Sequence, residues 1–149
     1  MEHWELVARE AIRETIGRYA HAADSGRFDE LVELFAADGV LEVYGEPPLA
    51  GRDAIRAFLQ GASASLADAS TVPLIRHHNT SITIEVVNHD EARAACYFLA
   101  ITEHGLDHWG RYRDNFTRDG EQWLFAHRRV RTDGKTPGGW AAGRVADEL

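Results

Sequence analysis

The sequence contains very little cysteine, with one residue, Cys96, in a chain of 149. A single cysteine cannot form a disulfide within the chain, so the class of small disulfide-stabilised domains is excluded. Cys96 lies in an apolar strand pattern, and we expect a small core side chain there rather than a nucleophile. The chain is long enough to be stabilised by a hydrophobic core in one domain.

Long hydrophobic runs and an excess of positive charge are also missing. No stretch is long enough to span a membrane and no signal peptide is visible, so we expect a cytoplasmic protein without a membrane partner. The net charge of −8 argues against nucleic acid as a partner. No pair of histidines has the HxH or HxxxH spacing that would place both on one face beside a carboxylate. We therefore expect no metal site, and we expect no cofactor.

Apolar residues recur at helical spacing in the first part of the chain. The first helix is expected to end at Asp24, because Gly26 follows as a stop signal. A second short helix is expected from Phe28 to Phe35, and a third with Asp53 as its N-cap. The buried faces of the first and third helices are expected to contain Leu6, Ala11, Ile12, Ile16, Tyr19, Ala20, Ala23, Ile55, Phe58, Leu59 and Leu66.

Further along the chain, apolar residues alternate with polar ones, as is typical of strands. Helices followed by strands predict an α+β fold with a strongly bent antiparallel sheet. The domain is expected to cover residues 1–132, followed by an irregular tail over 133–149 that Trp140 docks on the body. The expected strands cover residues 40–44, 77–86, 92–103, 108–118 and 123–131, with a hairpin turn at Asp119-Gly120.

Asp24 occupies a position that is electrostatically unfavourable for a carboxylate. At the C-terminus of a helix it faces the negative end of the helix dipole, and it borders an apolar stripe. Such placement is found at functional sites, although a solvated carboxylate beside a turn is the alternative. The His77-His78 doublet supplies a candidate base, since an imidazole held by a carboxylate suits proton abstraction near neutral pH.

The order and spacing of these residues resemble SnoaL-like domains of the nuclear-transport-factor-2-like superfamily over about residues 5 to 132. The resemblance implies a cone-shaped α+β barrel, in which a strongly curved antiparallel sheet wraps around the N-terminal helices and encloses an apolar pocket. The matching pieces are Tyr19-x4-Asp24-Ser25-Gly26-x-Phe28-x2-Leu31-x3-Phe35-x2-Asp38-Gly39, Gly51-x3-Ile55, Arg76-His77, Gly110-Arg111-Tyr112-x-Asp114 and Trp123-x3-His127-Arg128-x-Val130.

The resemblance also implies roles for individual residues. Lyases of this superfamily, such as scytalone dehydratase, hexachlorocyclohexane dehydrochlorinase and bile-acid 7α-dehydratase, use an Asp–His dyad. Asp24 and His77 match that dyad, and Tyr19 and Arg128 match polar groups that assist it. The expected substrate-binding residues are Tyr44, His78, Phe35 and Tyr112.

Two interpretations of the histidine doublet remain open. Strict alternation places His78 on the face of Ile82 and Ile84, whereas the family spacing to Thr80 favours His77. A β-bulge in this strand would reconcile the two, and bulges are common beside active sites. We take His77 as the base and His78 as the reserve.

Two further sites have alternative interpretations. Arg128 shares its expected face with Leu124, Ala126 and Val130, so it points toward an apolar interior. There it either pairs with a carboxylate such as Asp114 or stabilises a substrate oxygen. His104 and His108 are expected on a loop, near the position of a second histidine in scytalone dehydratase.

We therefore expect a cofactor-independent lyase of the dehydratase type that acts on a hydrophobic, cyclic or polycyclic, oxygenated small molecule. An isomerase or a polyketide cyclase needs the same base, and a non-catalytic binding or assembly subunit is the alternative from another class. The resemblance also implies a homo-oligomer, either a trimer or a dimer. Whether Asp24 reaches a histidine decides between a catalytic dyad and a scaffold.

Overall fold

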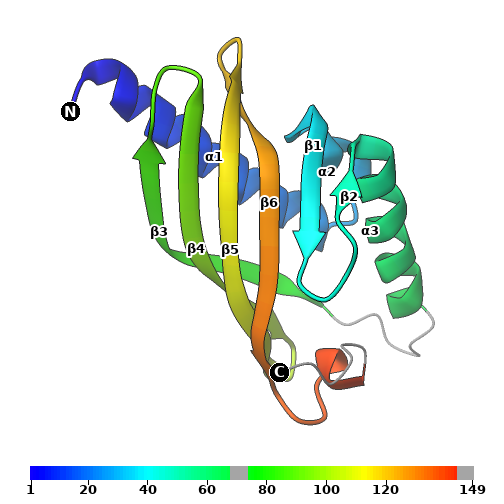
Figure 1. Ribbon diagram of the computed structural model, residues 1–149. Helices are drawn as coiled ribbons and strands as arrows, with labels where there is room; N and C mark the ends of the chain where they lie inside the picture. The colour runs from blue at the N-terminus through cyan, green and yellow to red at the C-terminus, as the bar shows by residue number, and fades with distance from the viewer. Residues whose placement is uncertain (68–73, 144–149) are drawn as a thin grey trace.

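The fold is a single curved sheet with all three α-helices on one side, as the computed structural model of residues 1–67 and 74–143 shows (Figure 1). The helices are α1 (His3–Asp24), α2 (Phe28–Val32) and α3 (Arg52–Ala67). The strands are β1 (Phe35–Val43), β2 (Leu49–Ala50), β3 (Arg76–Val86), β4 (Glu91–Thr102), β5 (Gly105–Asp119) and β6 (Gln122–Lys135), and a short 3₁₀ helix, η1, covers Trp140–Gly143.

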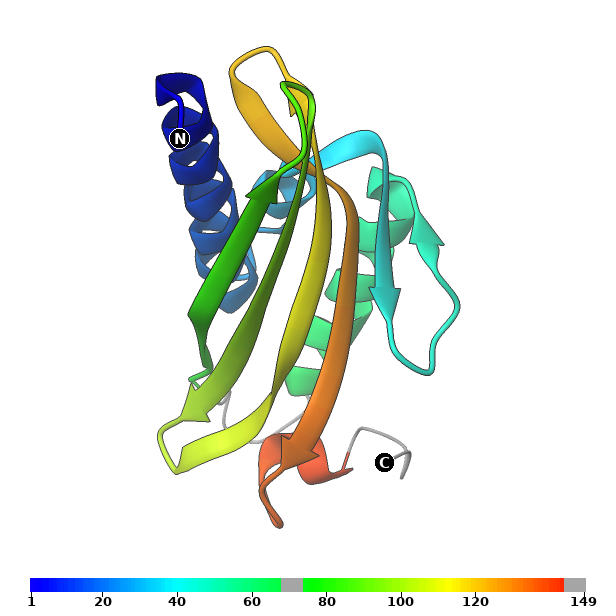
Figure 2. The same cartoon turned by 60° about the vertical axis from the view of Figure 1, so that its left-hand side comes forward.

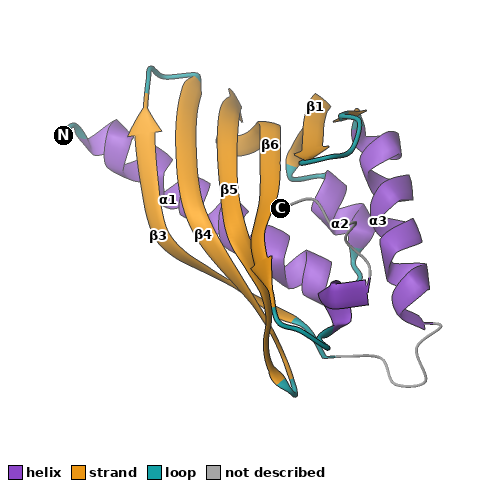
Figure 3. Ribbon diagram, turned by 60° about the horizontal axis from the view of Figure 1, so that its bottom comes forward, coloured by secondary structure: helices purple, strands orange, loops and turns teal. Residues whose placement is uncertain are grey.

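The strands lie in the order β2-β1-β6-β5-β4-β3. The long strands β3 to β6 bend together, and the sheet stays open (Figure 2). Helix α1 crosses the side of the sheet formed by β3 to β6, whereas α3 lies beside β1 (Figure 3). This arrangement is the α+β fold with a curved sheet that the sequence predicts.

Helix α1 forms where the sequence predicts it. Glu2 and Glu5 form a capping box at its start, which satisfies two backbone groups that the helix leaves unpaired. Gly26 adopts a φ of 67°, a conformation that favours glycine, directly after the helix ends. The buried residues follow helical spacing as Ala8, Ile12, Thr15, Ile16, Tyr19, Ala20 and Ala22.

The inner face of the sheet packs against this helix. Strand β4 shows strict alternation, with small or apolar side chains buried and their neighbours exposed. Because the buried positions of β4 hold mostly alanine, α1 and the aromatic side chains of the neighbouring strands have space to pack. The buried residues of β4 are Ala92, Ala94, Cys96, Phe98 and Ala100.

Alternation is interrupted at several register shifts, and those in β3, β5 and the middle of β6 decide which side chains of the site face inward. In β3 the register shifts between Thr80 and Thr83, where Ser81 has a φ of 51°. In β5 the extra residue is Asp107, which lies between His108, the partner of Ala100, and Leu106, the partner of Ile101. In β6 it is Ala126, opposite the step from Asn115 to Phe116. Each bulge moves the inward face by one residue.

Several boundaries differ from those expected. The sheet is mixed rather than wholly antiparallel, because β1 pairs with β6 in parallel. Phe35 begins β1 instead of ending α2, and Asp53 lies inside the first turn of α3 rather than at its N-cap. Strand β6 continues to Lys135, past the point where an irregular tail was expected.

Not all of the apolar residues expected on the buried helix faces are seen to be buried. Leu6 is half exposed, because helical spacing places it on the side of α1 opposite the buried Ala8 and Ile12. The side chain of Leu66 lies outside the described residues.

Candidate active site

The C-terminal end of α1 and the start of β3 bring Asp24 and His77 into direct contact. The Nδ1 atom of His77 lies 2.6 Å from Oδ1 of Asp24, and the backbone N–H of His77 donates to Oδ2 at 2.9 Å. The carboxylate therefore holds both the ring and the backbone of the same residue. The Asp24 side chain is 8% exposed and that of His77 is 23% exposed, so the pair is shielded while the imidazole remains accessible.

The bulge in β3 selects His77 rather than His78. His77 lies opposite Ala100, which is completely buried, and residues directly opposite in an antiparallel pair share a face. Beyond the bulge, Ile84 lies opposite Ala94 on that same face. His78 is exposed on the other face, so its expected position in the site is wrong. The bulge that would reconcile the two interpretations is present.

A second histidine, His108, lies near His77 on β5. Its Nδ1 atom is 2.8 Å from Oδ2 of Asp107, whose carboxylate is 2% exposed. Burial lowers the pKa of His108; the hydrogen bond to Asp107 opposes this shift and the charge of His77 adds to it. His108 is therefore neutral at neutral pH.

The sequence pattern did not identify Asp107 as a residue of the site, and it predicted that His108 lies on a loop, whereas His108 lies in β5. The adjacent Asp107 and His108 are both buried, which strict alternation forbids and the bulge at Asp107 allows. An Asp-His pair followed by Trp109 was the only local signal. His104 lies in the turn before β5, with its side chain exposed.

The two imidazole rings are arranged edge to face, with ring centroids 5.9 Å apart at 77°. Phe98 lies beside both, 6.0 Å from His77 and 5.9 Å from His108. Its ring has space because Gly110 is its cross-strand partner, where a Cβ atom would lie 2.8 Å from Phe98. The site is thus two carboxylate-bound histidines beside an aromatic ring.

Arg128 lies in a separate buried cluster that we call the Arg128 cluster, formed with Tyr19, Tyr112, Asp114 and Phe125. Its guanidinium carbon is 3.6 Å from the ring centroid of Tyr112 and 4.1 Å from that of Tyr19. Its Nε atom is 3.4 Å from Oδ1 of Asp114, and both side chains are fully buried. Arg128 therefore points into the interior and pairs with Asp114, as one of the two expected interpretations has it. The bulge at Ala126 makes Phe125 its inward neighbour in place of the expected Leu124 and Ala126.

Burial controls ionisation in the Arg128 cluster. Burial raises the pKa of Asp114 to about 6, although the charge of Arg128 opposes this. Burial also raises the pKa of Tyr19 and Tyr112, so both phenols stay protonated. Among the described residues, the Arg128 guanidinium and the Asp114 carboxylate form an ion pair with each other but have no hydrogen-bond partner, which is uncommon for buried donors and acceptors.

Comparison with known protein families shows to which family the chain belongs. A family model described as a SnoaL-like domain matches residues 4–129. The chain belongs to the SnoaL-like domain family. No curated protein sequence matches it significantly.

Solved structures agree with this assignment of the SnoaL-like chain. A scytalone dehydratase-like protein from Novosphingobium aromaticivorans is 28% identical with a TM-score of 0.78, covering 91% of each chain. An NTF2-like protein with a cystatin-like fold from the same organism is 31% identical, covering 91% of this chain and 86% of its own, with a TM-score of 0.71. A Catenulispora acidiphila protein in complex with S-DNPA is 26% identical, with a TM-score of 0.73. The match covers 85% of this chain and 93% of the Catenulispora chain.

The remaining expected site residues of this SnoaL-like domain lie away from the two histidines. Tyr44 lies in the turn directly after β1, is 59% exposed and packs against Arg131, so the structure does not bring it to the two histidines. Phe35 is buried and packs on Phe125, at the edge of the Arg128 cluster. Tyr112 joins Phe98 to that cluster, with ring centroids 4.8 Å apart.

Two other properties concern the described ranges of the SnoaL-like domain, 1–67 and 74–143. No helix there is long and apolar enough to cross a membrane. No group of three or more histidine, cysteine, aspartate or glutamate side chains there is arranged to hold a metal ion.

Proposed function

We propose that this SnoaL-like protein is a cofactor-independent lyase that removes water from a hydrophobic, cyclic, oxygenated small molecule. The observation that carries the proposal is the double contact of the Asp24 carboxylate with the ring and backbone of His77. The similarity to a scytalone dehydratase-like protein supports it.

The contact fixes the chemistry of the imidazole. An ionised carboxylate only accepts hydrogen bonds, so Asp24 requires the ring proton of His77 on Nδ1 and leaves the Nε2 lone pair free. Nε2 is then the base, and Asp24 stabilises the imidazolium that forms when a proton is taken up. Because the imidazole ring itself takes up the substrate proton at Nε2, this step needs no cofactor.

One histidine suffices to move the proton through the whole reaction. Nε2 of His77 takes a proton from the carbon beside a carbonyl, and the C–H electron pair forms the new C=C bond. The C–O bond on the neighbouring carbon breaks, and the imidazolium returns its proton to the leaving hydroxyl as water. His108, which is neutral, would accept a hydrogen bond from a substrate hydroxyl through its own Nε2.

The surroundings of the histidines indicate the substrate class. The rings of Phe98 and Trp140 lie beside the imidazoles, so an apolar cyclic molecule matches the site better than a charged one. Arg128 is separated from His77 by the rings of Phe98 and Tyr112. We assign it the role of a buried positive charge that favours negative charge developing on a substrate oxygen, with Tyr19 holding it in place.

The test is turnover of cyclic β-hydroxy ketones of increasing ring number, followed by absorbance of the conjugated product and by mass spectrometry. Asp24→Asn is expected to lower kcat by about 10³- to 10⁴-fold, because the carboxamide donates to Nδ1 and moves the ring proton to Nε2. Asp119→Asn is the matched control, since Asp119 is exposed at the hairpin turn.

Three results would overturn the proposal. A product of unchanged mass identifies an isomerase or a cyclase. Ligand binding that raises the melting temperature, without any turnover across the panel, identifies a binding subunit. Full activity in Asp24→Asn removes the dyad from the mechanism.

A further inference from the structure

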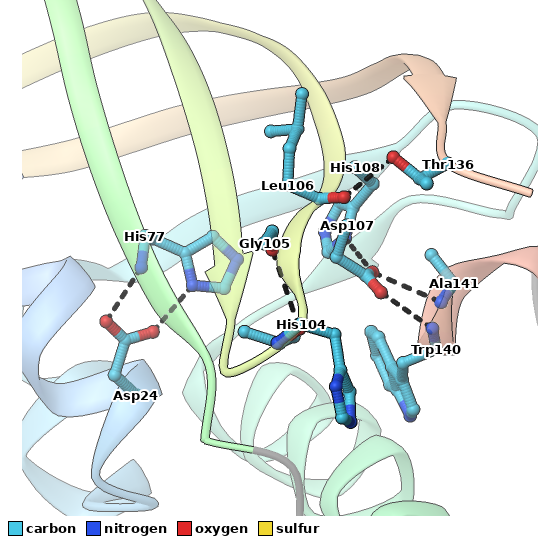
Figure 4. A network of polar contacts seen from close by, with 11 residues as sticks. Asp24, His77, His104, Gly105, Leu106, Asp107, His108, Thr136, Trp140 and Ala141 are labelled. Carbon is cyan, nitrogen blue, oxygen red and sulfur yellow. Dashed lines mark hydrogen bonds and ion pairs between the residues drawn. The ribbon is translucent and has the colours of Figure 1, made fainter. Parts of the chain in front are cut away.

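The carboxylate of Asp107 connects His108 to the C-terminal segment, residues 136–143. Within residues 1–67 and 74–143, three groups bind it: Nδ1 of His108 at 2.8 Å, the backbone N–H of Trp140 at 2.6 Å and the backbone N–H of Ala141 at 3.2 Å (Figure 4). Over the same ranges, no arginine or lysine forms an ion pair with it. A buried carboxylate needs such donors, because leaving it unpaired is costly.

Further contacts hold the same segment against β5. The backbone N–H of Thr136 donates to the carbonyl of Asp107, and its hydroxyl donates to the carbonyl of Leu106, both at 2.7 Å. At Gly139 a Cβ atom would lie 2.7 Å from Oδ1 of Asp107, so only glycine permits the observed approach. The Trp140 ring lies 5.9 Å from the imidazole of His108.

We propose that Asp107 is a positioning residue through which the C-terminal segment holds the His108 imidazole in one tautomer and orientation. Two backbone N–H groups of the segment fix the carboxylate, and the fixed carboxylate accepts the Nδ1–H of His108. Nε2 of His108 is then the unprotonated nitrogen. This mirrors Asp24 and His77, with the difference that the second carboxylate depends on a segment distant in sequence.

This role matters for catalysis only if the proposed function holds, because His108 must meet substrate through Nε2. A neutral imidazole with its proton on Nε2 donates a hydrogen bond instead of accepting one. Loss of the contact with Asp107 therefore changes which substrate group His108 can bind. The tautomer is measurable without substrate, so failure of the lyase proposal and failure of this one are distinguishable.

The first test is ¹⁵N NMR of the imidazole nitrogens in the full-length labelled protein. In the wild type, Nδ1 of His108 is expected to be protonated and Nε2 unprotonated. In Asp107→Asn, the carboxamide oxygen still accepts from the backbone N–H of Trp140, which holds the shorter of the two backbone bonds. Its NH₂ group then takes the place of Oδ2, where it faces Nδ1 of His108 and the N–H of Ala141 loses its acceptor. The ring proton is then expected to move to Nε2, with loss of the Nδ1–H signal.

Two controls accompany this measurement. The tautomer of His77 reports that the fold is retained in Asp107→Asn, since Asp24 still holds it. Asp119→Asn, at an exposed position, is expected to change neither histidine. Retention of the Nδ1 proton on His108 in folded Asp107→Asn would overturn the proposal.

The second test separates the segment from the carboxylate. Gly139→Ala keeps Asp107 but adds a Cβ atom in its path, so the segment has to move. We expect the backbone amides of Trp140 and Ala141 to exchange with solvent about tenfold faster or more, and His108 to populate both tautomers. Gly17→Ala is the matched control, since a Cβ there meets nothing within 4 Å.

Two outcomes of the second test count against the proposal. Faster amide exchange with an unchanged His108 tautomer means that Asp107 acts without the segment. Unchanged amide exchange means that the segment does not depend on its contact with Asp107.

Discussion

The imidazole rings of His77 and His108 lie 5.9 Å apart at 77°, and each is held at Nδ1 by a buried carboxylate. The arrangement leaves the Nε2 atoms of both rings as acceptors in the neutral state. The charge of His77 also disfavours protonation of His108, so the two rings resist carrying charge together. A single proton can thus be taken up at the pair and released again, as elimination of water requires.

His77 and His78 are expected to differ sharply in function although they are neighbours. His77→Gln should lower kcat by about 10³-fold, because it removes the base. His78→Gln should retain nearly wild-type activity, since this side chain is exposed on the other face of β3. Steady-state kinetics on the same substrate measures both. Equal loss in the two variants would contradict the assignment by the bulge.

The Arg128–Asp114 pair is expected to couple strongly in stability. Arg128→Met and Asp114→Asn should each lower the free energy of unfolding by about 3 to 5 kcal/mol, because each leaves a buried partner unpaired. The double variant should cost less than the sum, as measured by chemical denaturation in a double-mutant cycle. The exposed pair Arg93–Glu85 is the control, where Glu85→Gln should have no measurable effect. Additive losses at the buried pair would contradict the coupling.

The pH dependence of stability should report His108. Its pKa in the folded chain is below the ordinary 6.5, so the unfolded chain takes up this proton first as pH falls. The contribution of His108 to stability is therefore complete above pH 6.5 and is lost as the pH falls below it. As the pH is lowered from about 8 to about 5, the melting temperature should fall more in the wild type than in His108→Gln. Parallel curves would show that His108 has an unperturbed pKa.

Ser81 should tolerate glycine better than a β-branched residue. Its φ of 51° lies in the left-handed region, where a branched side chain is strained. Ser81→Val is expected to lower the free energy of unfolding by about 1 to 3 kcal/mol, whereas Ser81→Gly should be nearly neutral. Thr83→Val, at the next residue of regular pairing, is the control. NMR signals of the His77 imidazole should also change in Ser81→Val if the bulge orients this ring.

The sequence predicted the parts of the site that depend on local pattern. Helical spacing and Gly26 placed Asp24 at the end of α1, and the apolar strand pattern around Cys96 predicted that this side chain is buried in β4. Both signals arise within a few residues, because helix and strand periods are local properties of the chain. The resemblance then paired Asp24 with His77, and the two residues are in contact.

Only the tertiary structure decided which side chains of β3, β5 and β6 face inward. The bulges at Ser81, Asp107 and Ala126 reverse the alternation that surrounds them, and through them His77 replaces His78, Asp107 joins His108, and Arg128 joins Phe125. A bulge is fixed by the pairing of one strand with its neighbour and by what packs beneath it. That information lies in residues far apart in the chain, so local period alone does not contain it.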